Sequence, residues 1–211
     1  MRRFRHAKRT CPYSDATHCY LGLDGSTAPG SGNSYGIDGG FYAVGDGCST
    51  INWNAATRCA SGTLCAKDPP YYLNWGAEIA LNLNSNNGYE YGYDSTANGV
   101  TGFFWEVTGT APGMQVWVPI TANLGACLQT TNACELQEPP WGNPTPTMGP
   151  GGNNFVMIQT PNMSYDNWGL GYTYPPPWDP TRLHSIQWKL PAQDFATPFS
   201  LCVQKVGVIH N

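Results

Sequence analysis

The chain has 211 residues, of which only 11% are charged, against about 25% in a typical soluble domain, while Gly (25), Pro (18), Tyr (12) and Trp (8) are abundant. Five of its ten basic residues lie before residue 10, which leaves five basic residues against fourteen acidic ones in the rest of the chain. An acidic body repels phosphate backbones, so nucleic acid is an unfavourable partner, and no run of about 18 apolar residues is present to form a membrane-spanning helix.

The first 33 residues show no lasting periodicity and are rich in Gly, Ser and Thr. We interpret them as an N-terminal extension that precedes a single domain over residues 34–211. The basic cluster at the start favours a flexible tail. The alternatives are an RNA-binding arm or the beginning of a signal peptide, although the apolar stretch that a signal peptide needs does not follow.

From about residue 34, short runs with strand periodicity alternate with turn signals, and long helical periodicity is absent. This pattern predicts an all-β, two-sheet antiparallel sandwich. Pro-rich stretches at 139–150 and 175–180 are expected to be loops. The expected strands are, in chain order, "GGFYAVGD", "WGAEIALNLN" (75–84), "TGFFWEV", "MQVWVPI", "NNFVMIQTP", "LHSIQWKL" (183–190) and "FSLCVQKVGVI".

The eight cysteines have loop-like spacings and form no C-x₂₋₄-C pair of the kind that zinc sites use. An even number of cysteines in this context indicates disulfides and therefore export from the cytoplasm. The simplest of the 105 connectivities pairs near neighbours and joins the remaining two over a long range. It reads Cys11–Cys19, Cys59–Cys65, Cys127–Cys134 and Cys48–Cys202.

Four segments, taken in order, resemble extracellular carbohydrate-binding modules with the galactose-binding-like β-jelly-roll fold. "YDSTANGVTGFFWEVTG" is similar to the family strand "YDAS-x-YTGISFWAKG", and "MQVWVP" to the strand after it. "WGAEIALNLN" is similar to the early strand "GWGAGIGLNLN". "WDPTRLHSIQWKLPAQDFATPFSLCVQKVGVI" resembles the ending "FDPSKLYGIQFQV", a short loop and "FDFWIDDIRFI". The resemblance covers roughly residues 36–209 and implies a jelly roll that binds carbohydrate.

The chain departs from the family in the final strand, where two acids of the family motif are replaced by Gln204 and Lys205. One of those acids commonly helps to hold a structural calcium ion, and an ammonium group cannot ligate a cation. Asp38 and Asp46, near the first strand, remain as oxygen donors for such a site. No other cofactor is expected.

Strand parity separates a core face from a second face. Phe103, Trp105 and Val107 match inward positions of the family pattern, and the expected core adds Ile79, Leu81, Val116, Ile186, Trp188, Leu201 and Val203. The second face is expected to be an exposed, concave glycan cleft with an aromatic platform and a few directed polar groups. The residues assigned to this cleft are Phe104, Glu106, Gln115, Trp117, Glu78 and Gln187, with Lys189 exposed beside them.

The loop "GLGYTYPPPWDP" carries Tyr172, Tyr174 and Trp178, which are further candidates for sugar contact. Stacking of these aromatic rings on the loop's own prolines is the alternative. The second-face aromatics have a similar alternative, in which they pack under the extension or under the long segments 128–154 and 163–180. His184 has no second histidine at ligand spacing and is expected to have no catalytic or metal role.

We therefore predict non-catalytic polysaccharide or oligosaccharide binding by a monomeric module that is secreted, periplasmic or on the cell surface. The first alternative is a jelly-roll glycoside hydrolase, because Glu78 and Glu106 share the predicted face and such enzymes use two carboxyl groups across one sheet. No E-x-D-x-x-E signature supports that alternative. The second alternative is a structural or protein-contact sandwich.

Overall fold

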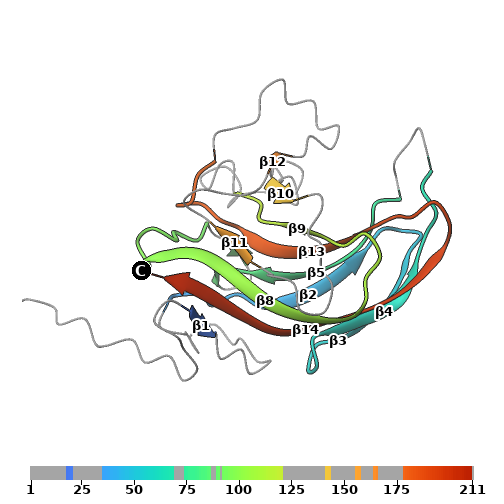
Figure 1. The fold of residues 1–211 in the computed structure, drawn as a ribbon, viewed down its shortest axis with the longest axis horizontal. Helices are drawn as coiled ribbons and strands as arrows, with labels where there is room; N and C mark the ends of the chain where they lie inside the picture. Colours follow the sequence, from blue (N-terminus) through green and yellow to red (C-terminus); the bar gives the residue numbers. More distant parts are fainter. Residues whose placement is uncertain are drawn as a thin grey trace, which may run out of the picture.

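The computed structural model describes residues 18–20, 35–68, 74–86, 89–90, 92–120, 141–143, 155–157, 164–165 and 178–210. Over these ranges the chain is all-β, with two six-stranded antiparallel sheets and one two-stranded ribbon (Figure 1). None of the described residues belongs to a helix, so none belongs to a membrane-spanning one. The predicted antiparallel sandwich is confirmed.

The two large sheets are called sheet A and sheet B. Sheet A has the order β11 (Phe155–Met157), β8 (Val100–Thr110), β14 (Thr197–His210), β4 (Cys59–Leu64) and β3 (Thr50–Asn54). Sheet B has the order β12 (Ser164–Tyr165), β10 (Trp141–Asn143), β9 (Gln115–Trp117), β13 (Ser185–Pro191), β5 (Gly76–Asn82) and β2 (Phe41–Gly45). The ribbon consists of β6 (Ser85–Asn86) and β7 (Tyr89–Glu90).

Strand β14 organises sheet A because it is long enough to have different neighbours along its length. It pairs with β8 over most of its residues and with β4 over its first half. Near its end it pairs with β1 (His18–Tyr20), whose residues lie opposite Gly207, Val208 and Ile209. Part of the predicted N-terminal extension is therefore a strand of sheet A.

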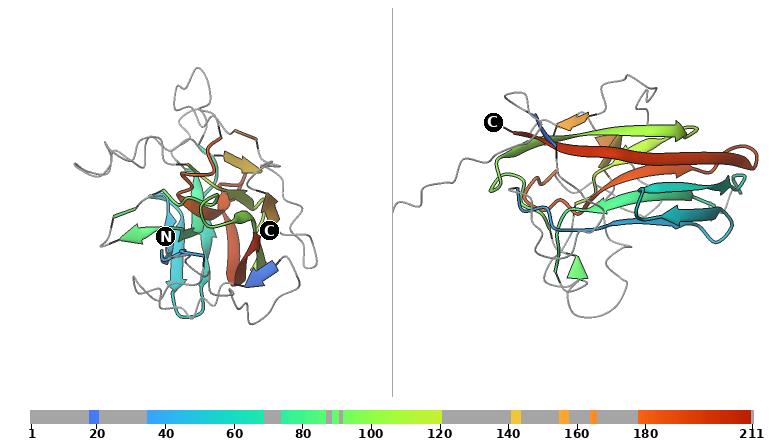
Figure 2. Two further views of the ribbon diagram at one scale, coloured as in Figure 1. Left: turned by 90° about the vertical axis from the view of Figure 1, so that its left-hand side faces the viewer. Right: turned by 90° about the horizontal axis from the view of Figure 1, so that it is seen from below.

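The hydrophobic core lies between the two sheets and follows the predicted parity. Phe103 and Trp105 of sheet A, and Ile79, Ile186 and Trp188 of sheet B, are buried there. The other predicted core residues are also buried (Leu81, Val116, Leu201, Val203) or half-buried (Val107). Trp188 joins the layers, because its ring meets Trp105 edge-on with centroids 6.1 Å apart. Figure 2 shows the layers from two further directions.

The long strands bend in one sense, so that the sandwich has an inner and an outer side. Figure 1 shows β13 and β9 of sheet B on the inside of the bend, with β8 and β14 of sheet A along the outside. The face of sheet B that is turned away from the core is therefore the concave one.

Two disulfides lie within the described residues, and they differ from the predicted pairs. Cys48 is joined to Cys65, and Cys59 to Cys202, rather than Cys59 to Cys65 and Cys48 to Cys202. The reason is strand pairing: β14 lies beside β4 in a register that places Cys202 directly opposite Cys59. The predicted pairs Cys11–Cys19 and Cys127–Cys134 lie outside the residues whose side chains are described.

Candidate functional site

The outer face of sheet B, on the inside of the bend, carries two neighbouring rows of side chains that cross its central strands. Each row follows from the strand registers, because residues of equal parity on paired strands point to one side of a sheet. The first row is Val44, Glu78, Lys189 and Gln115. The second row is Tyr42, Ala80, Gln187 and Trp117. We call these two rows the sheet B face.

An ammonium group lies between two indole rings near the centre of the first row. Lys189 Nζ is 3.0 Å from Glu78 Oε2, 4.3 Å from the centroid of the Trp117 ring and 5.0 Å from that of Trp75. Both charged side chains are largely buried, which strengthens their mutual attraction and the attraction of the cation for the rings. The pair leaves the centre of the face electrically neutral.

Hydrogen bonds fix the side chains next to this ion pair. Trp117 Nε1 donates to Gln115 Oε1 over 3.2 Å, which sets the orientation of the indole ring. In the second row, Gln187 Nε2 donates to Ser185 Oγ over 3.2 Å, and the same hydroxyl lies 3.0 Å from His184 Nδ1. The polar groups on this face are held in place by one another.

The predicted parity of the sheet B face is correct, but the predicted exposure is wrong for three of its residues. Trp117, Glu78 and Gln187 point away from the core, yet they are only 4%, 6% and 8% exposed. Gln115, Lys189, Tyr42 and Trp75 are half-buried, and Val44 is exposed. These five side chains are the part of the site that a ligand can reach.

Phe104 and Glu106 do not belong to this site, contrary to expectation. Both lie on β8 in sheet A, and their side chains point outward on the opposite side of the sandwich. Glu106 forms an exposed ion pair with Lys205 at 2.9 Å. Parity could not detect this separation, because it assigns a residue to a face but does not assign a strand to a sheet.

This arrangement also overturns the predicted carboxylate pair. Glu78 and Glu106 lie on the outer faces of different sheets, with the whole core between them. Two carboxyl groups that act on one glycosidic bond must flank it within about 10 Å. Glu78 and Glu106 cannot meet that requirement.

The final strand contains a β-bulge, which explains the position of Gln204 and Lys205. The register shifts between Val203 and Lys205, so that Gln204 is an extra residue and both Gln204 and Lys205 are exposed. The Arg58 guanidinium donates to the carbonyl oxygens of Val203 and Gln204, each over 3.1 Å. A basic side chain thus stabilises the bulge at the position where the family motif has acids.

Asp46, a predicted calcium ligand, has a different role. Its carboxylate accepts hydrogen bonds from the backbone N–H groups of Cys48 (3.0 Å), Ser49 and Gly76 (2.6 Å). Three N–H dipoles directed at one carboxylate oppose a cation at the same oxygens. Burial alone would raise the pKa of Asp46, but these hydrogen bonds outweigh it and lower the pKa below its usual value.

The described residues, Asp38 among them, hold no group of three His, Cys, Asp or Glu side chains that could bind a metal ion. Of the loop aromatics, Trp178 is half-buried and packs against the core rather than standing free as a sugar platform. Tyr172 and Tyr174 lie outside the described residues.

Sequence reasoning missed three residues of the site: Tyr42, Trp75 and Lys189. The parity of "FYAVG" could have found Tyr42, because Phe41 and Ala43 point to the core and Tyr42 to the other side. Lys189 was placed on the correct face but was not assigned to the site. Trp75 precedes β5, and no strand periodicity reports where its side chain lies.

No protein-family model and no curated protein matches the chain. Among solved structures, the chain is similar to the family 11 carbohydrate-binding module of the cellulosomal cellulase Lic26A-Cel5E of Clostridium thermocellum. The TM-score is 0.43 and the identity 11%, over 91% of this chain and 95% of that one. A Clostridium thermocellum family 11 module in complex with a β-1,3-1,4-mixed-linked tetrasaccharide gives a TM-score of 0.41 at 11% identity, over 93% and 98% of the two chains. At these values neither structure transfers a ligand or a site residue to this chain.

Proposed function

We propose that the protein binds carbohydrate without catalysis, on the sheet B face. The observation that carries the proposal is the composition of the two rows. Together with Trp75, whose ring lies beside Lys189, they place two indole rings, a phenol ring, two amides, one carboxylate and one ammonium group on the side of a sheet that the core does not use. Aromatic rings present flat apolar surfaces to the C–H faces of pyranose rings, and the polar groups exchange hydrogen bonds with hydroxyls.

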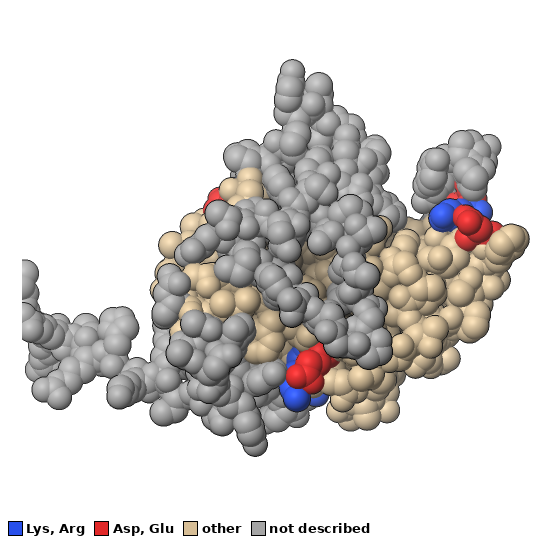
Figure 3. Space-filling view, in the orientation of Figure 1, with Lys and Arg blue, Asp and Glu red and all other residues tan. Residues whose placement is uncertain are grey.

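The charge of the face favours an uncharged glycan. Lys189 and Glu78 neutralise each other, and the remaining side chains of both rows are neutral. On the side of the molecule that Figure 3 shows, charged side chains of the described surface lie at a few separate places, with uncharged surface between them. An anionic ligand would gain no net electrostatic attraction on the sheet B face and would lose its hydration.

The accessible and the buried residues of the sheet B face have different roles in the proposed binding. Tyr42, Trp75, Lys189 and Gln115 are half-buried and can touch a ligand, whereas Trp117 and Gln187, on the same face, are buried and held by hydrogen bonds. The first row crosses four strands and is therefore about 14 Å long, since adjacent strands lie about 4.8 Å apart. A row of this length suits a glycan chain of several sugar units.

The two disulfides are consistent with an extracellular setting, because such bonds persist in oxidising compartments. We infer that the protein is exported and acts as a monomer with polysaccharide or oligosaccharide as its partner.

The proposal is tested by co-sedimentation with insoluble cellulose, xylan and chitin, using Tyr42→Ala and the matched variant Phe104→Ala. Both variants remove a half-buried aromatic ring from an outward-facing strand position, but they do so on opposite sides of the sandwich. We expect Tyr42→Ala to lower retention on the bound polysaccharide about tenfold, because ring stacking and a hydroxyl contact together contribute about 1–2 kcal/mol. Phe104→Ala should bind as the wild type does.

Retention of the wild type on none of the three polysaccharides would overturn the proposal and favour the structural or protein-contact alternative. Release of reducing sugar by the wild type would instead indicate an enzyme. Equal losses in both variants, with unchanged melting temperatures, would remove the assignment to the sheet B face.

A further inference from the structure

The connection between β13 and β14 presents an aromatic ring to solvent. This connection, residues 192–196, lies at one end of the sandwich, and Phe195 within it is 80% exposed. Among the described residues, Val44 is the other large hydrophobic side chain that is exposed, at 40%. Single exposed apolar residues are ordinary on protein surfaces, so exposure alone assigns no role. Phe195 differs from an ordinary exposed apolar residue because hydrogen bonds hold the connection that carries it.

We call residues 192–196 the tip. Its backbone is hydrogen-bonded to two other segments of the chain. The Gln193 N–H group donates to Cys65 O over 3.4 Å, and the Lys67 N–H group donates to Gln193 O over 2.8 Å, which forms a parallel bridge. The Ala192 N–H group donates to Trp75 O over 3.3 Å. Cys65 is itself fixed by its disulfide to Cys48. The tip is therefore a supported element of the sandwich.

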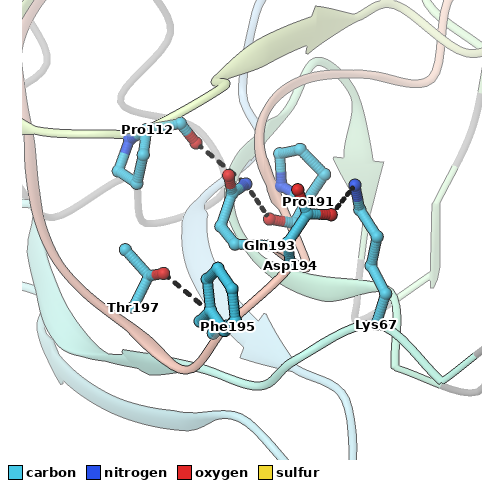
Figure 4. A network of polar contacts seen from close by, with 7 residues as sticks. All are labelled: Lys67, Pro112, Pro191, Gln193, Asp194, Phe195 and Thr197. Carbon is cyan, nitrogen blue, oxygen red and sulfur yellow. Dashed lines mark hydrogen bonds and ion pairs between the residues drawn. The ribbon is translucent and has the colours of Figure 1, made fainter.

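Side chains add a second set of restraints, which Figure 4 shows from close by. Gln193 Nε2 donates to the carbonyl oxygens of Pro191 (2.6 Å) and Pro112 (3.3 Å), which links the tip to the turn after β8. Lys67 Nζ lies 3.0 Å from Asp194 Oδ1, and Thr197 Oγ1 donates to Phe195 O over 2.7 Å. These contacts hold the residues on both sides of Phe195 while its ring stays in solvent.

A fixed, exposed ring is suited to binding, because the entropy of ordering its backbone is lost on folding and not on association. The groups next to it have the right chemistry for hydroxyls. The Asp194 carboxylate can accept hydrogen bonds and the Lys67 ammonium can donate them, and both side chains are exposed. An aromatic ring with one acceptor and one donor beside it is a small site for a pyranose ring.

We propose that Phe195, together with Asp194 and Lys67, is a second sugar-contact site. The class of ligand rests on the proposed function, and the location is independent of it. The tip begins three residues after Lys189 at the end of β13, and its backbone is bonded to Trp75, so it lies to one side of the first row, in the direction of the strands that the row crosses. A polysaccharide that lies on the face can place a further sugar unit over Phe195.

The first experiment measures retention of the full chain on cellulose, xylan and chitin, with the variants Phe195→Ala, Phe195→Trp and Asn52→Ala. Asn52 is an exposed position on β3 in sheet A and serves as the control. We expect Phe195→Ala to bind about three- to tenfold more weakly, Phe195→Trp to bind at least as well as the wild type, and Asn52→Ala to bind unchanged. Equal binding by Phe195→Ala and the wild type would overturn the proposal.

The second experiment locates the contact by amide chemical shifts, with cellotetraose, xylotetraose and chitotetraose as probes. Shifts at residues 193–197 that disappear in Phe195→Ala support the tip site. Shifts confined to β2, β5, β9 and β13 would overturn the tip site and leave the sheet B face standing. A response at neither place, with no retention on any polysaccharide, would overturn the proposed function itself.

Discussion

Asp46 shows how one buried carboxylate can complete a turn. It lies directly after β2 and accepts hydrogen bonds from the two turn residues Cys48 and Ser49 and from Gly76, at the start of β5. Gly76 O in turn accepts from the Asp46 N–H group over 2.9 Å. One residue therefore joins the turn after β2 to the next strand of sheet B, and its contribution depends on its charge.

This charge dependence predicts how stability changes with pH. Because folding lowers the pKa of Asp46, its contribution is fully present above the unfolded value of about 3.9 and is lost as the pH falls through the lower folded value. We expect Asp46→Asn to cost about 1–3 kcal/mol at pH 7 and to weaken the acid-induced fall of the melting temperature between about pH 5 and pH 2.

Asp94→Asn is the matched control, because the Asp94 carboxylate accepts a backbone hydrogen bond from Ala97 within a turn. Thermal melts followed by circular dichroism over this pH range compare the three proteins. An Asp46→Asn curve parallel to that of the wild type would show that Asp46 does not carry the dependence.

At the scale of strands, the pairing of β8 with β14 dominates sheet A, and it requires a glycine. Gly109 in β8 has φ +114°, and a Cβ atom there would lie 2.0 Å from the Ser200 carbonyl oxygen of β14. A residue with a side chain rarely adopts this backbone angle. Its Cβ atom would also force β14 to move away. The close approach of the two strands at this point depends on that residue.

We expect Gly109→Ala to destabilise the protein by more than about 3 kcal/mol, because a forbidden φ and a clash with a neighbouring strand add together. Gly99→Ala separates the two effects. Gly99 has φ +68°, and no atom lies within 4 Å of the position that a Cβ atom would take, so only the conformational cost of about 1–2 kcal/mol should appear. Urea denaturation measures both, and similar losses would show that the contact with Ser200 is unimportant.

The limits of sequence reasoning also appear at this scale. Alternation along each strand correctly predicted that Phe103 and Trp105 face the core and that Phe104 and Glu106 do not. The alternation is local, and so it could not reveal that β8 belongs to sheet A whereas β5, β9 and β13 belong to sheet B. Strand partners are chosen by contacts between distant parts of the chain.

The same limit explains the parts of the site that were not predicted. Trp117 is buried although it points away from the core. Its exposure depends on which residues surround it in space, and alternation along a strand carries no information about them. The position of Lys189 between two indole rings joins residues from before β5, from β9 and from β13. The Cys59–Cys202 disulfide follows from the register of β4 and β14, which no spacing of cysteines encodes.

For the molecule as a whole, the two described disulfides close loops of very different size. Cys48–Cys65 spans 17 residues, whereas Cys59–Cys202 spans 143 and links the first part of the chain to the last strand. A cross-link restricts the unfolded chain more strongly when it closes a longer loop. The long-range bond therefore limits the unfolded state of most of the protein.

We expect Cys59→Ala/Cys202→Ala to lower the free energy of unfolding by about 2 kcal/mol more than Cys48→Ala/Cys65→Ala does, as the ratio of the loop lengths requires. Each double variant is the control for the other, since each removes two sulfur atoms. Urea midpoints and slopes at neutral pH give the comparison. A larger loss from the short-range bond would contradict a mechanism based on the unfolded chain.

The pairing of β1 with the end of β14 fixes where polypeptide enters and leaves the sandwich. His18 lies opposite Ile209, so the chain before β1 and the chain after β14 depart from the same pole, as the position of the C-terminus beside β1 in Figure 1 shows. Strand β14 runs from that pole to the tip that carries Phe195, a span of roughly 45 Å for its fourteen residues. A neighbouring domain or a surface attached at either end would hold the protein at one pole. The opposite pole, which carries Phe195, would then face away from the attachment and stay open to solvent.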